Sequence, residues 1–451
     1  MAIAYSKLLQ FFLYLLIVSL FLPGFIYQYV ALFALFIVFL FGDSKKKINY
    51  KYFALLLSVI LLVALSYSFN IYFNSIDYRT IIYWSFSYFP PLFLLGILVC
   101  GSQKVDISRL YTFYKAIVFI QSVLLIYSSF THGVFVVGDD AKGTVGNANF
   151  VAFHIAVVLL YEANSLLWNY SSYGSIQKIK KELELLYYFL VFMIPESTAN
   201  IGFFFIIMAL TFIRIVILKK NWKVIIVLGL IAPIAVSIFT DTYIYERIKT
   251  EYNKISLVNI EEDLVFTKIK VYISLLNGDI YTDVNPLVGS GPATFTSRSS
   301  VIRMPDIRYN SPPKIVPIDT YYSDVFIKFM LPLELELKDS PRGNLSTPKT
   351  TVISIAVELG MLGILILFFA LAYVIYRFMT ERTDAYLSSF GIDITLLFVM
   401  NLFFLNSWEY PIYSFVYILF AVTVYRTLRS LSIIVICDQR LLLREDSSYA
   451  T

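Results

Sequence analysis

Histidine and cysteine are almost absent from this sequence, and charged residues are scarce. The 451 residues include two histidines and two cysteines, and 15% of them are charged. With only His132 and His154, a histidine metal cluster is excluded. Cys100 and Cys437 are too few for the disulfide scaffold of a small secreted protein. An ordinary soluble domain is about 25% charged, so this composition argues against a water-soluble globule.

Apolar residues make up 59% of the chain and gather in long stretches separated by polar loops. About a dozen of these stretches are long enough for a membrane-crossing helix. The alternating segments of ~10 residues that β-barrel strands require are not found. We therefore expect an all-α polytopic membrane protein of about 12 transmembrane helices. The predicted spans are Leu8–Pro23, Tyr27–Phe41, Tyr52–Phe69, Ile81–Cys100, Thr112–Phe130, Asn149–Trp168, Leu183–Ile194, Ile201–Leu218, Val224–Phe239, Val352–Tyr376, Tyr386–Leu405 and Pro411–Leu428.

One long polar stretch, from about Thr240 to Thr350, interrupts the apolar pattern late in the chain. It contains 13 Lys and Arg and 14 Asp and Glu, so the net charge of +5 resides in the short loops. Apolar runs inside the stretch predict short helices packed on the membrane face. The chain thus divides into transmembrane helices 1–9 over 1–239, a large loop over 240–350, transmembrane helices 10–12 over 351–430 and a tail over 431–451.

Basic residues follow every even-numbered predicted span. Because cytoplasmic loops carry an excess of Lys and Arg, these loops are expected on the cytoplasmic side. Both termini are then cytoplasmic, and the large loop is exoplasmic. The residues concerned are Lys45, Lys46, Lys47, Lys104, Arg109, Lys178, Lys180, Lys181, Arg214, Lys219, Lys220, Lys223, Arg377, Arg382, Arg426 and Arg429.

The loop after the fifth predicted span holds a short motif rich in glycine and asparagine. Gly143 and Gly146 allow backbone amides to approach a phosphate closely. Asn147 and Asn149 add amide donors where a helix begins, which is a favourable place for an anion. The competing interpretation is an asparagine-capped helix after a glycine turn, with no ligand.

A second glycine motif lies in the large loop, over 285–295. Gly289 and Gly291 alone indicate only a tight turn, but several cations follow them. Guanidinium groups suit bidentate phosphate binding, whereas a solvated basic rim is the simpler interpretation. The cations are Arg298, Arg303, Arg308 and Lys314.

Acidic side chains also occur inside predicted spans. Glu358 lies near the outer end of the tenth span, in Glu-Leu-Gly-Met-Leu-Gly at 358–363. A carboxylate in an apolar helix is a functional candidate by default, and a structural hydrogen bond is the alternative. Glu162 and His154 in the sixth span pose the same question, and for His154 we favour a packing role.

Together these features resemble the O-antigen ligase and polysaccharide polymerase superfamily of bacterial envelope enzymes. The resemblance rests on the late loop among about twelve spans and on three motifs. These are Gly-Thr-Val-Gly-Asn-Ala-Asn at 143–149, Pro-Leu-Val-Gly-Ser-Gly-Pro-Ala-Thr-Phe at 286–295, and Glu-Leu-Gly-Met-Leu-Gly at 358–363. It implies a glycosyltransferase of the bacterial inner membrane that works without a metal or other cofactor. The substrate would be an undecaprenyl-pyrophosphate-linked glycan, and the acceptor a glycan, a lipid A core or a protein.

The chain departs from the family pattern at several positions. The family's histidine would fall near Lys349 and Thr350, and neither is histidine. The arginine usual before the first motif is replaced by Lys142, and the one before the second motif by Lys268 or Lys270. The Ser-Arg pair expected after the seventh span reads Ser197-Thr198. Positive charge is partly kept while the base is not, which leaves ligase and polymerase both open.

By this resemblance, cations stabilise the departing pyrophosphate and a general base activates the acceptor. Lys349 is the positional candidate for the base, provided that burial or neighbouring cations lower its pKa. The catalytic candidates are Lys349, Lys142, Lys268 and Arg247. The substrate-binding candidates are Gly143, Gly146, Asn147, Asn149, Gly289, Gly291, Arg298, Arg303, Arg308 and Glu358.

A transporter or flippase for a polysaccharide precursor is the main alternative, since such proteins also have about twelve spans. They usually repeat their halves and bind near the bilayer midplane. Here no internal repeat is evident, and the polar motifs gather on one side. A purely structural membrane protein ranks third.

Overall fold

The computed structural model of this chain is mostly helical, and no β-strand occurs among the residues it describes. Helices are expected in an apolar solvent because they satisfy their backbone hydrogen bonds within one segment. The described residues are 2–42, 49–73, 79–101, 105–131, 143–145, 147–195, 197–219, 267–282, 284–296, 324–330, 350–381, 383–405 and 407–448.

The α-helices follow one another with short connections in most of the described chain. Their order is α1 (Ala2–Ser19), α2 (Phe25–Gly42), α3 (Tyr50–Phe73), α4 (Arg79–Cys100), α5 (Ile107–Thr131), α6 (Ala148–Asn169), α7 (Ser175–Met193), α8 (Thr198–Lys219), α11 (Thr267–Asn277), α14 (Thr351–Glu358), α15 (Gly360–Thr380), α16 (Ala385–Phe404) and α17 (Pro411–Ser448). Shorter helical turns are η1 (Gly143–Val145), η2 (Tyr170–Ser172), η4 (Asp279–Thr282) and η5 (Phe326–Met330).

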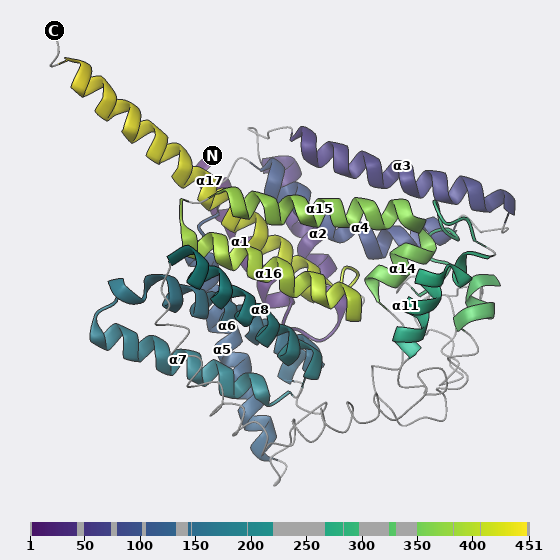
Figure 1. Cartoon of the computed structure of the whole chain (residues 1–451), viewed down its shortest axis with the longest axis horizontal. Coiled ribbons are helices and arrows are strands. Elements are labelled where there is room, and N and C mark those ends of the chain that lie inside the picture. The colour runs from purple at the N-terminus through teal and green to yellow at the C-terminus, as the bar shows by residue number, and fades with distance from the viewer. Residues whose placement is uncertain are drawn as a thin grey trace.

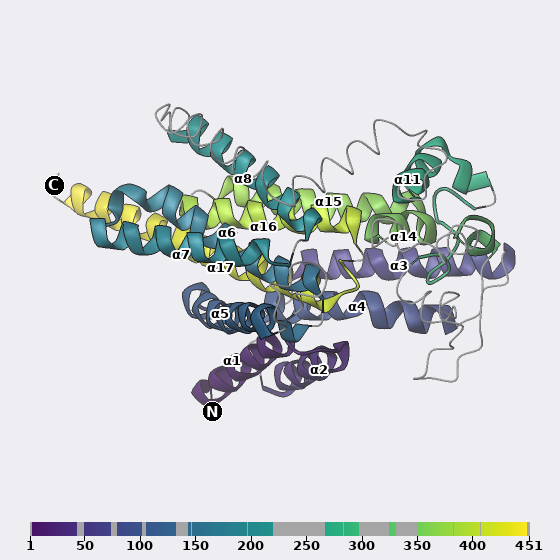
Figure 2. The ribbon, with the colours of Figure 1, turned by 90° about the horizontal axis from the view of Figure 1, so that it is seen from below.

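The long helices run back and forth along one axis, so the bundle has two distinct ends (Figures 1 and 2). The starts of α6 and α8 and the junction of α14 with α15 lie toward one end, which we call the motif end. The start of α7, with Lys178, and the end of α15, with Arg377, lie toward the other end, where α17 projects from the bundle, and we call it the basic end. Which side of a membrane each end faces stays a prediction from the charge pattern.

Seven helices in the described part of the chain are long and apolar enough to cross a membrane. They cover Tyr50–Tyr72, Ile107–Phe130, Ala148–Ser172, Ala199–Leu218, Gly360–Thr380, Ala385–Phe404 and Pro411–Ile433. Shorter apolar helices cover Lys7–Ser19, Phe25–Phe41 and Trp84–Cys100. These ten match spans that the sequence predicts. The ninth predicted span, Val224–Phe239, lies outside the described residues.

Two of the predicted spans differ in form from the expectation. The seventh, Leu183–Ile194, is the second half of α7, a helix whose first half carries several charged residues. The tenth, Val352–Tyr376, is not one helix, because α14 ends at Glu358 and α15 begins at Gly360. Gly360 has φ +67°, a left-handed conformation that breaks the helix and favours glycine.

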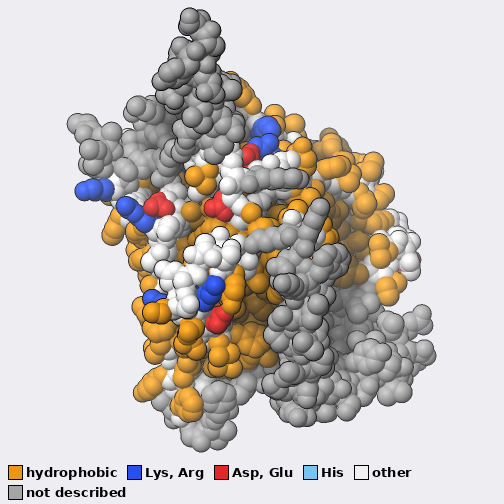
Figure 3. All heavy atoms as spheres, turned by 60° about the vertical axis from the view of Figure 1, so that its left-hand side comes forward, with side chains coloured by type: hydrophobic (Ala, Val, Ile, Leu, Met, Phe, Trp, Pro, Cys, Tyr) orange, Lys and Arg blue, Asp and Glu red, His pale blue; other side chains and the backbone are white. Residues whose placement is uncertain are grey.

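Helix α6 forms the centre of the bundle, because 89% of the residues in its 18-residue apolar stretch are buried. Helices α5, α7, α8 and α16 pack around it. On the periphery, only 17% and 22% of the residues are buried in the 18-residue apolar stretches of α3 and α15. Many of the large apolar side chains of these two helices are exposed. Hydrophobic side chains cover much of the described surface in Figure 3. Such an apolar exterior suits lipid rather than water.

Candidate functional site

Glu358 is fully buried at the motif end, where its carboxylate holds the glycine-rich segment in place. The backbone amide of Ala293 donates to Oε2 at 2.9 Å, and that of Phe295 donates to Oε1 at 3.1 Å. Charge-assisted hydrogen bonds of this kind are about twice as strong as neutral ones. Glu358 therefore acts as a clamp between α14 and a segment more than sixty residues away along the chain. Its contact with a substrate stays a prediction.

Backbone hydrogen bonds extend this clamp along both segments. The amides of Ser290 and Gly291 donate to the carbonyls of Val357 and Glu358 at 2.8 and 3.0 Å. In the opposite direction, the amide of Met361 donates to the carbonyl of Pro286 at 2.9 Å. The break between α14 and α15 makes these bonds possible, because it turns helix-end carbonyls and amides toward a new partner. The motifs at 286–295 and 358–363 are thus one hydrogen-bonded unit.

Glycine is required where the two motifs cross. Gly289 has φ +73°, and a Cβ there would lie 2.5 Å from the carbonyl carbon of Glu358. On the opposite side, a Cβ on Gly360 would lie 2.4 Å from the carbonyl oxygen of Leu287. Both contacts are with backbone, which cannot move aside as a flexible side chain could. Backbone contact between the segments explains these two glycines without any ligand.

Helix α3 also supports this hydrogen-bonded unit. Ser66 Oγ donates to the carbonyl of Val288 at 2.6 Å, and Asn70 Nδ2 donates to the carbonyl of Gly289 at 3.0 Å. Both side chains are buried in an otherwise apolar helix. Sequence reasoning missed them, although two polar residues one turn apart in an apolar helix are a detectable signal. They help satisfy carbonyls that would otherwise be buried without a partner.

Helix α11 attaches the large loop to the same end. The Tyr272 hydroxyl donates to the carbonyl of Phe403 at 2.6 Å and lies 2.9 Å from Thr350 Oγ1. Thr350 in turn caps α14 by accepting from the amide of Ile353. Burial raises the pKa of Tyr272 to about 12, despite the hydrogen bond with Thr350, so the hydroxyl stays protonated at neutral pH. Thr350, which directly follows Lys349 in the chain, is therefore held in place by both α11 and α14.

The first motif is anchored beside the start of α6. Thr144 Oγ1 bonds to the carbonyl of Phe21 at 2.7 Å and to Gln121 Oε1 at 2.8 Å. Asn147 caps α6 by accepting from the amide of Asn149 at 2.8 Å. This agrees with the asparagine-capped helix that the sequence allows. It leaves phosphate binding by the motif as a prediction.

A chain of amides and a hydroxyl links this motif to α8 and α16. Ser197 Oγ donates to Asn149 Oδ1 at 2.6 Å, and Asn200 Nδ2 donates to Ser197 Oγ at 2.9 Å. Asn401 Nδ2 reaches Asn200 Oδ1 at 3.4 Å. The Ser197-Thr198 pair, noted in the sequence as a departure, thus contacts the first motif through its serine.

The loop between α16 and α17 lies between the two motif regions. Tyr410 packs against Phe150, next to Asn149, with ring centroids 5.5 Å apart. On its other side, Trp408 Nε1 donates to the carbonyl of Tyr88, and the Tyr88 hydroxyl donates to Glu409 at 3.4 Å. Glu409 is buried, and sequence reasoning missed it. An acidic residue in a very short loop on the motif side was the available signal.

Among the candidate cations, Lys268 lies on α11, where the structure describes its backbone. Gly143 begins η1 and Gly291 lies in the clamped segment, at φ +105°. Within the described ranges, no group of three His, Cys, Asp or Glu side chains is arranged to hold a metal ion. Six predicted cations and one predicted glycine lie outside the described residues: Lys142, Gly146, Arg247, Arg298, Arg303, Arg308 and Lys349.

The motif end therefore contains buried and half-buried carboxylates, amides and hydroxyls from α3, α4, α6, α8, α11 and α14, joined by the loop before α17. Such a rigid polar framework can hold loop residues in fixed positions near the end of an apolar bundle. Compared with models of known protein families and with curated proteins, the chain matches neither a family model nor a curated sequence.

Proposed function

We propose that this chain is a membrane glycosyltransferase that transfers or polymerises undecaprenyl-pyrophosphate-linked glycan at the outer face of a bacterial inner membrane. The observation that supports this most is the joining of 286–295 to 358–363 by the Glu358 clamp. These two motifs carry the resemblance to O-antigen ligases and polymerases. The third, at 143–149, lies at the same end of the bundle.

In the proposed reaction, a hydroxyl oxygen of the acceptor attacks the anomeric carbon of the lipid-linked glycan. The bond from that carbon to the pyrophosphate oxygen breaks, and the pyrophosphate lipid leaves with the bonding electron pair. The acceptor proton passes to a base. Cations around the pyrophosphate stabilise the charge that develops on it, which is the largest contribution a rigid polar site can make.

Several of the proposed cations are attached to elements of the motif framework. Lys142 directly precedes Gly143 of η1, and Lys349 directly precedes Thr350, the cap of α14. Lys268 lies one turn before Tyr272, whose hydroxyl pairs with Thr350. These attachments favour the convergence of positive charge that pyrophosphate binding needs.

The orientation of the chain provides the first test. We expect single cysteines at Ser256 and Ser299 to react with a membrane-impermeant reagent added to intact cells, and a cysteine at Ser44 to be protected. The result follows from the positive-inside rule applied to the basic loops. Labelling at Ser44 with protection in the large loop would place the motif end on the wrong side of the membrane for this chemistry.

Incubation of the purified protein with lipid-linked glycan provides the decisive test. Lengthened glycan on the lipid indicates a polymerase, and transfer to a lipid A core or to protein indicates a ligase. Lys142→Gln should abolish either reaction, whereas Lys180→Gln, at the basic end, should leave it intact. No change in the glycan, together with its appearance on the opposite side of proteoliposomes, would instead establish a flippase.

A further inference from the structure

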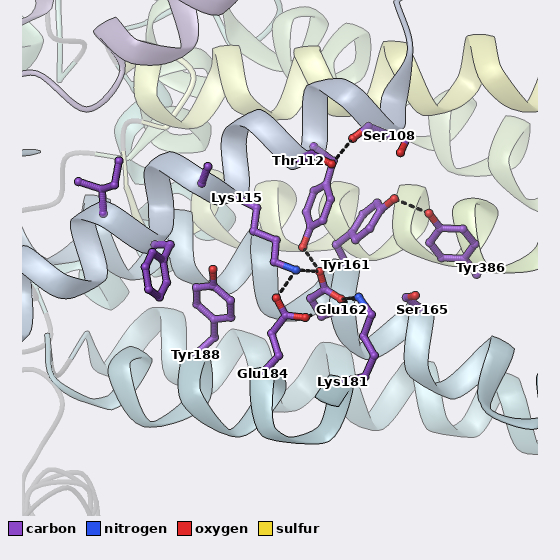
Figure 4. A pocket seen from close by; sticks show the side chains of 14 residues that line it. Ser108, Thr112, Lys115, Tyr161, Glu162, Ser165, Lys181, Glu184, Tyr188 and Tyr386 are labelled. Carbon is purple, nitrogen blue, oxygen red and sulfur yellow. Dashed lines mark hydrogen bonds and ion pairs between the residues drawn. The ribbon is translucent and has the colours of Figure 1, made fainter. Parts of the chain in front are cut away.

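A charged groove of ≈ 640 Å³ lies toward the basic end, and no residue of the glycine motifs lines it (Figure 4). Helices α5 and α7 form its two walls, and α6 forms its floor. Lys115 on α5 and Glu184 on α7 form an ion pair across it. Because the groove lies in the flank of an apolar bundle, lipid or water must occupy it when the protein is in a membrane. Nothing in the proposed glycosyl transfer uses it.

The charges in the groove form a balanced set of four. Lys115 and Lys181 both reach the buried Glu162, at 2.6 Å and 2.5 Å, and both pair with Glu184. The Tyr111 hydroxyl adds a hydrogen bond to Glu162 at 2.7 Å. Two ammonium groups therefore face two carboxylates, and the set has no net charge.

Three of these four groups are accessible from the groove. The side chains of Lys115, Lys181 and Glu184 are 22%, 28% and 23% exposed, whereas that of Glu162 is 2% exposed. Each ammonium has three donor hydrogens and two carboxylate partners here, so one hydrogen on each lysine is available. Each carboxylate oxygen of Glu184 can accept more than one hydrogen bond. The groove thus offers two positive donors and one negative acceptor to a ligand.

The polarity of the groove changes along its length. Thr112 and Ser108 line the part nearest the basic end, about one and two turns before Lys115 on the same face of α5. Beyond Lys115, the lining includes Phe119 and Ile120, which are 48% and 55% exposed. A ligand that fits this gradient has its polar group toward the basic end and a hydrocarbon chain toward the middle of the bundle. That is the orientation of a phospholipid in the leaflet at the basic end.

We infer that this groove binds a phospholipid whose headgroup carries a primary ammonium, such as phosphatidylethanolamine. Lys115 and Lys181 donate to the phosphate, and Glu184 accepts from the ammonium. A purely anionic headgroup satisfies the lysines but meets the carboxylates without a counter-charge. A quaternary ammonium cannot donate a hydrogen bond to Glu184. The balance of charge therefore selects the zwitterion with N–H groups.

Lipid retention by the purified protein tests this assignment. The protein is placed in nanodiscs of equal parts phosphatidylethanolamine, phosphatidylglycerol and phosphatidylcholine, and the lipid that stays bound after gentle release is counted by native mass spectrometry. We expect one retained phosphatidylethanolamine per chain. Lys181→Gln should lower its retention about tenfold, the value of one charge-assisted hydrogen bond. Lys180→Gln, an exposed neighbour outside the groove, should have no effect.

Two further variants separate binding from structural damage. Ala116→Phe fills the apolar part of the groove without touching the ion pairs, and it should also lose the lipid. Glu184→Gln leaves Lys115 and Lys181 paired with Glu162 but removes the carboxylate that accepts from the lipid ammonium. This variant should therefore retain phosphatidylglycerol in preference to phosphatidylethanolamine. Equal retention of all three lipids by the unmodified protein, or retention unchanged by Ala116→Phe, would overturn the assignment.

Discussion

The crossing of the two glycine motifs allows a quantitative prediction about Gly289→Ala. The new methyl group would lie 2.5 Å from the carbonyl carbon of Glu358 and 2.6 Å from the amide nitrogen of Gly360. A left-handed conformation costs a non-glycine residue about 1–2 kcal/mol. Forcing two backbone segments apart adds about 1–3 kcal/mol. The expected total is about 2–5 kcal/mol, borne mainly by the clamp between 286–295 and α14.

Gly278→Ala is the matched control for this change. Gly278 also has a left-handed φ, +85°, but a Cβ there would meet no atom within 4 Å. It therefore carries the conformational cost without the clash. The difference between the two variants, about 1–3 kcal/mol, isolates the close approach of the motifs.

Hydrogen exchange measured by mass spectrometry is the appropriate assay, since a single unfolding free energy is poorly defined for a chain with many segments. For each variant, the exchange rate near the changed residue is divided by the rate of the same peptides in the unmodified protein. This acceleration should be about 10- to 100-fold larger for 286–295 in Gly289→Ala than for the peptides around residue 278 in Gly278→Ala. Equal acceleration at the two sites, or unchanged exchange of 286–295 in Gly289→Ala, would refute the clamp as described.

Three further variants examine single side chains. Glu358→Gln can accept from only one of the two amides that the carboxylate satisfies, so it should cost about 1–3 kcal/mol and accelerate exchange of 286–295 in the same assay. Asp393 is fully buried and pairs with Arg214. Arg214→Leu leaves that buried carboxylate without its ion pair, which costs about 3–5 kcal/mol, so it should lower the thermal midpoint in detergent. A double change of both residues to Leu should recover most of this loss, because an unpaired buried charge costs more than a lost pair. Lys349→Arg keeps its charge but cannot deprotonate near neutral pH, so it should retain substantial transfer activity if Lys349 acts electrostatically; complete loss in a folded protein would favour a base at this position.

The apolar helices could be predicted from the sequence because each one depends on a local property. Length and hydropathy decide whether a segment can satisfy its own backbone in lipid, and ten predicted spans coincide with apolar helices in the described residues. The cap at Asn147 was also a local matter, since a capping side chain bonds to an amide two residues away.

The candidate site was predicted less completely, because its contacts join residues that are distant in sequence. Glu358 was recognised as unusual, but its two amide partners lie 65 and 63 residues away. Nothing near Ser66 or Asn70 indicates that they bond to carbonyls more than two hundred residues later. The break at Gly360 was missed, since the apolar pattern runs through it without interruption.

Sequence alone determined that the described chain is built largely of apolar helices, because burial of apolar surface and backbone satisfaction act within each segment. Tertiary structure decided what the charged and polar residues inside those helices do. Glu358 became a clamp for a distant turn, and Glu162 became the buried centre of a four-charge groove. A charge in an apolar interior needs a counter-charge or hydrogen bonds, and only the packing of other helices against it determines which groups supply them.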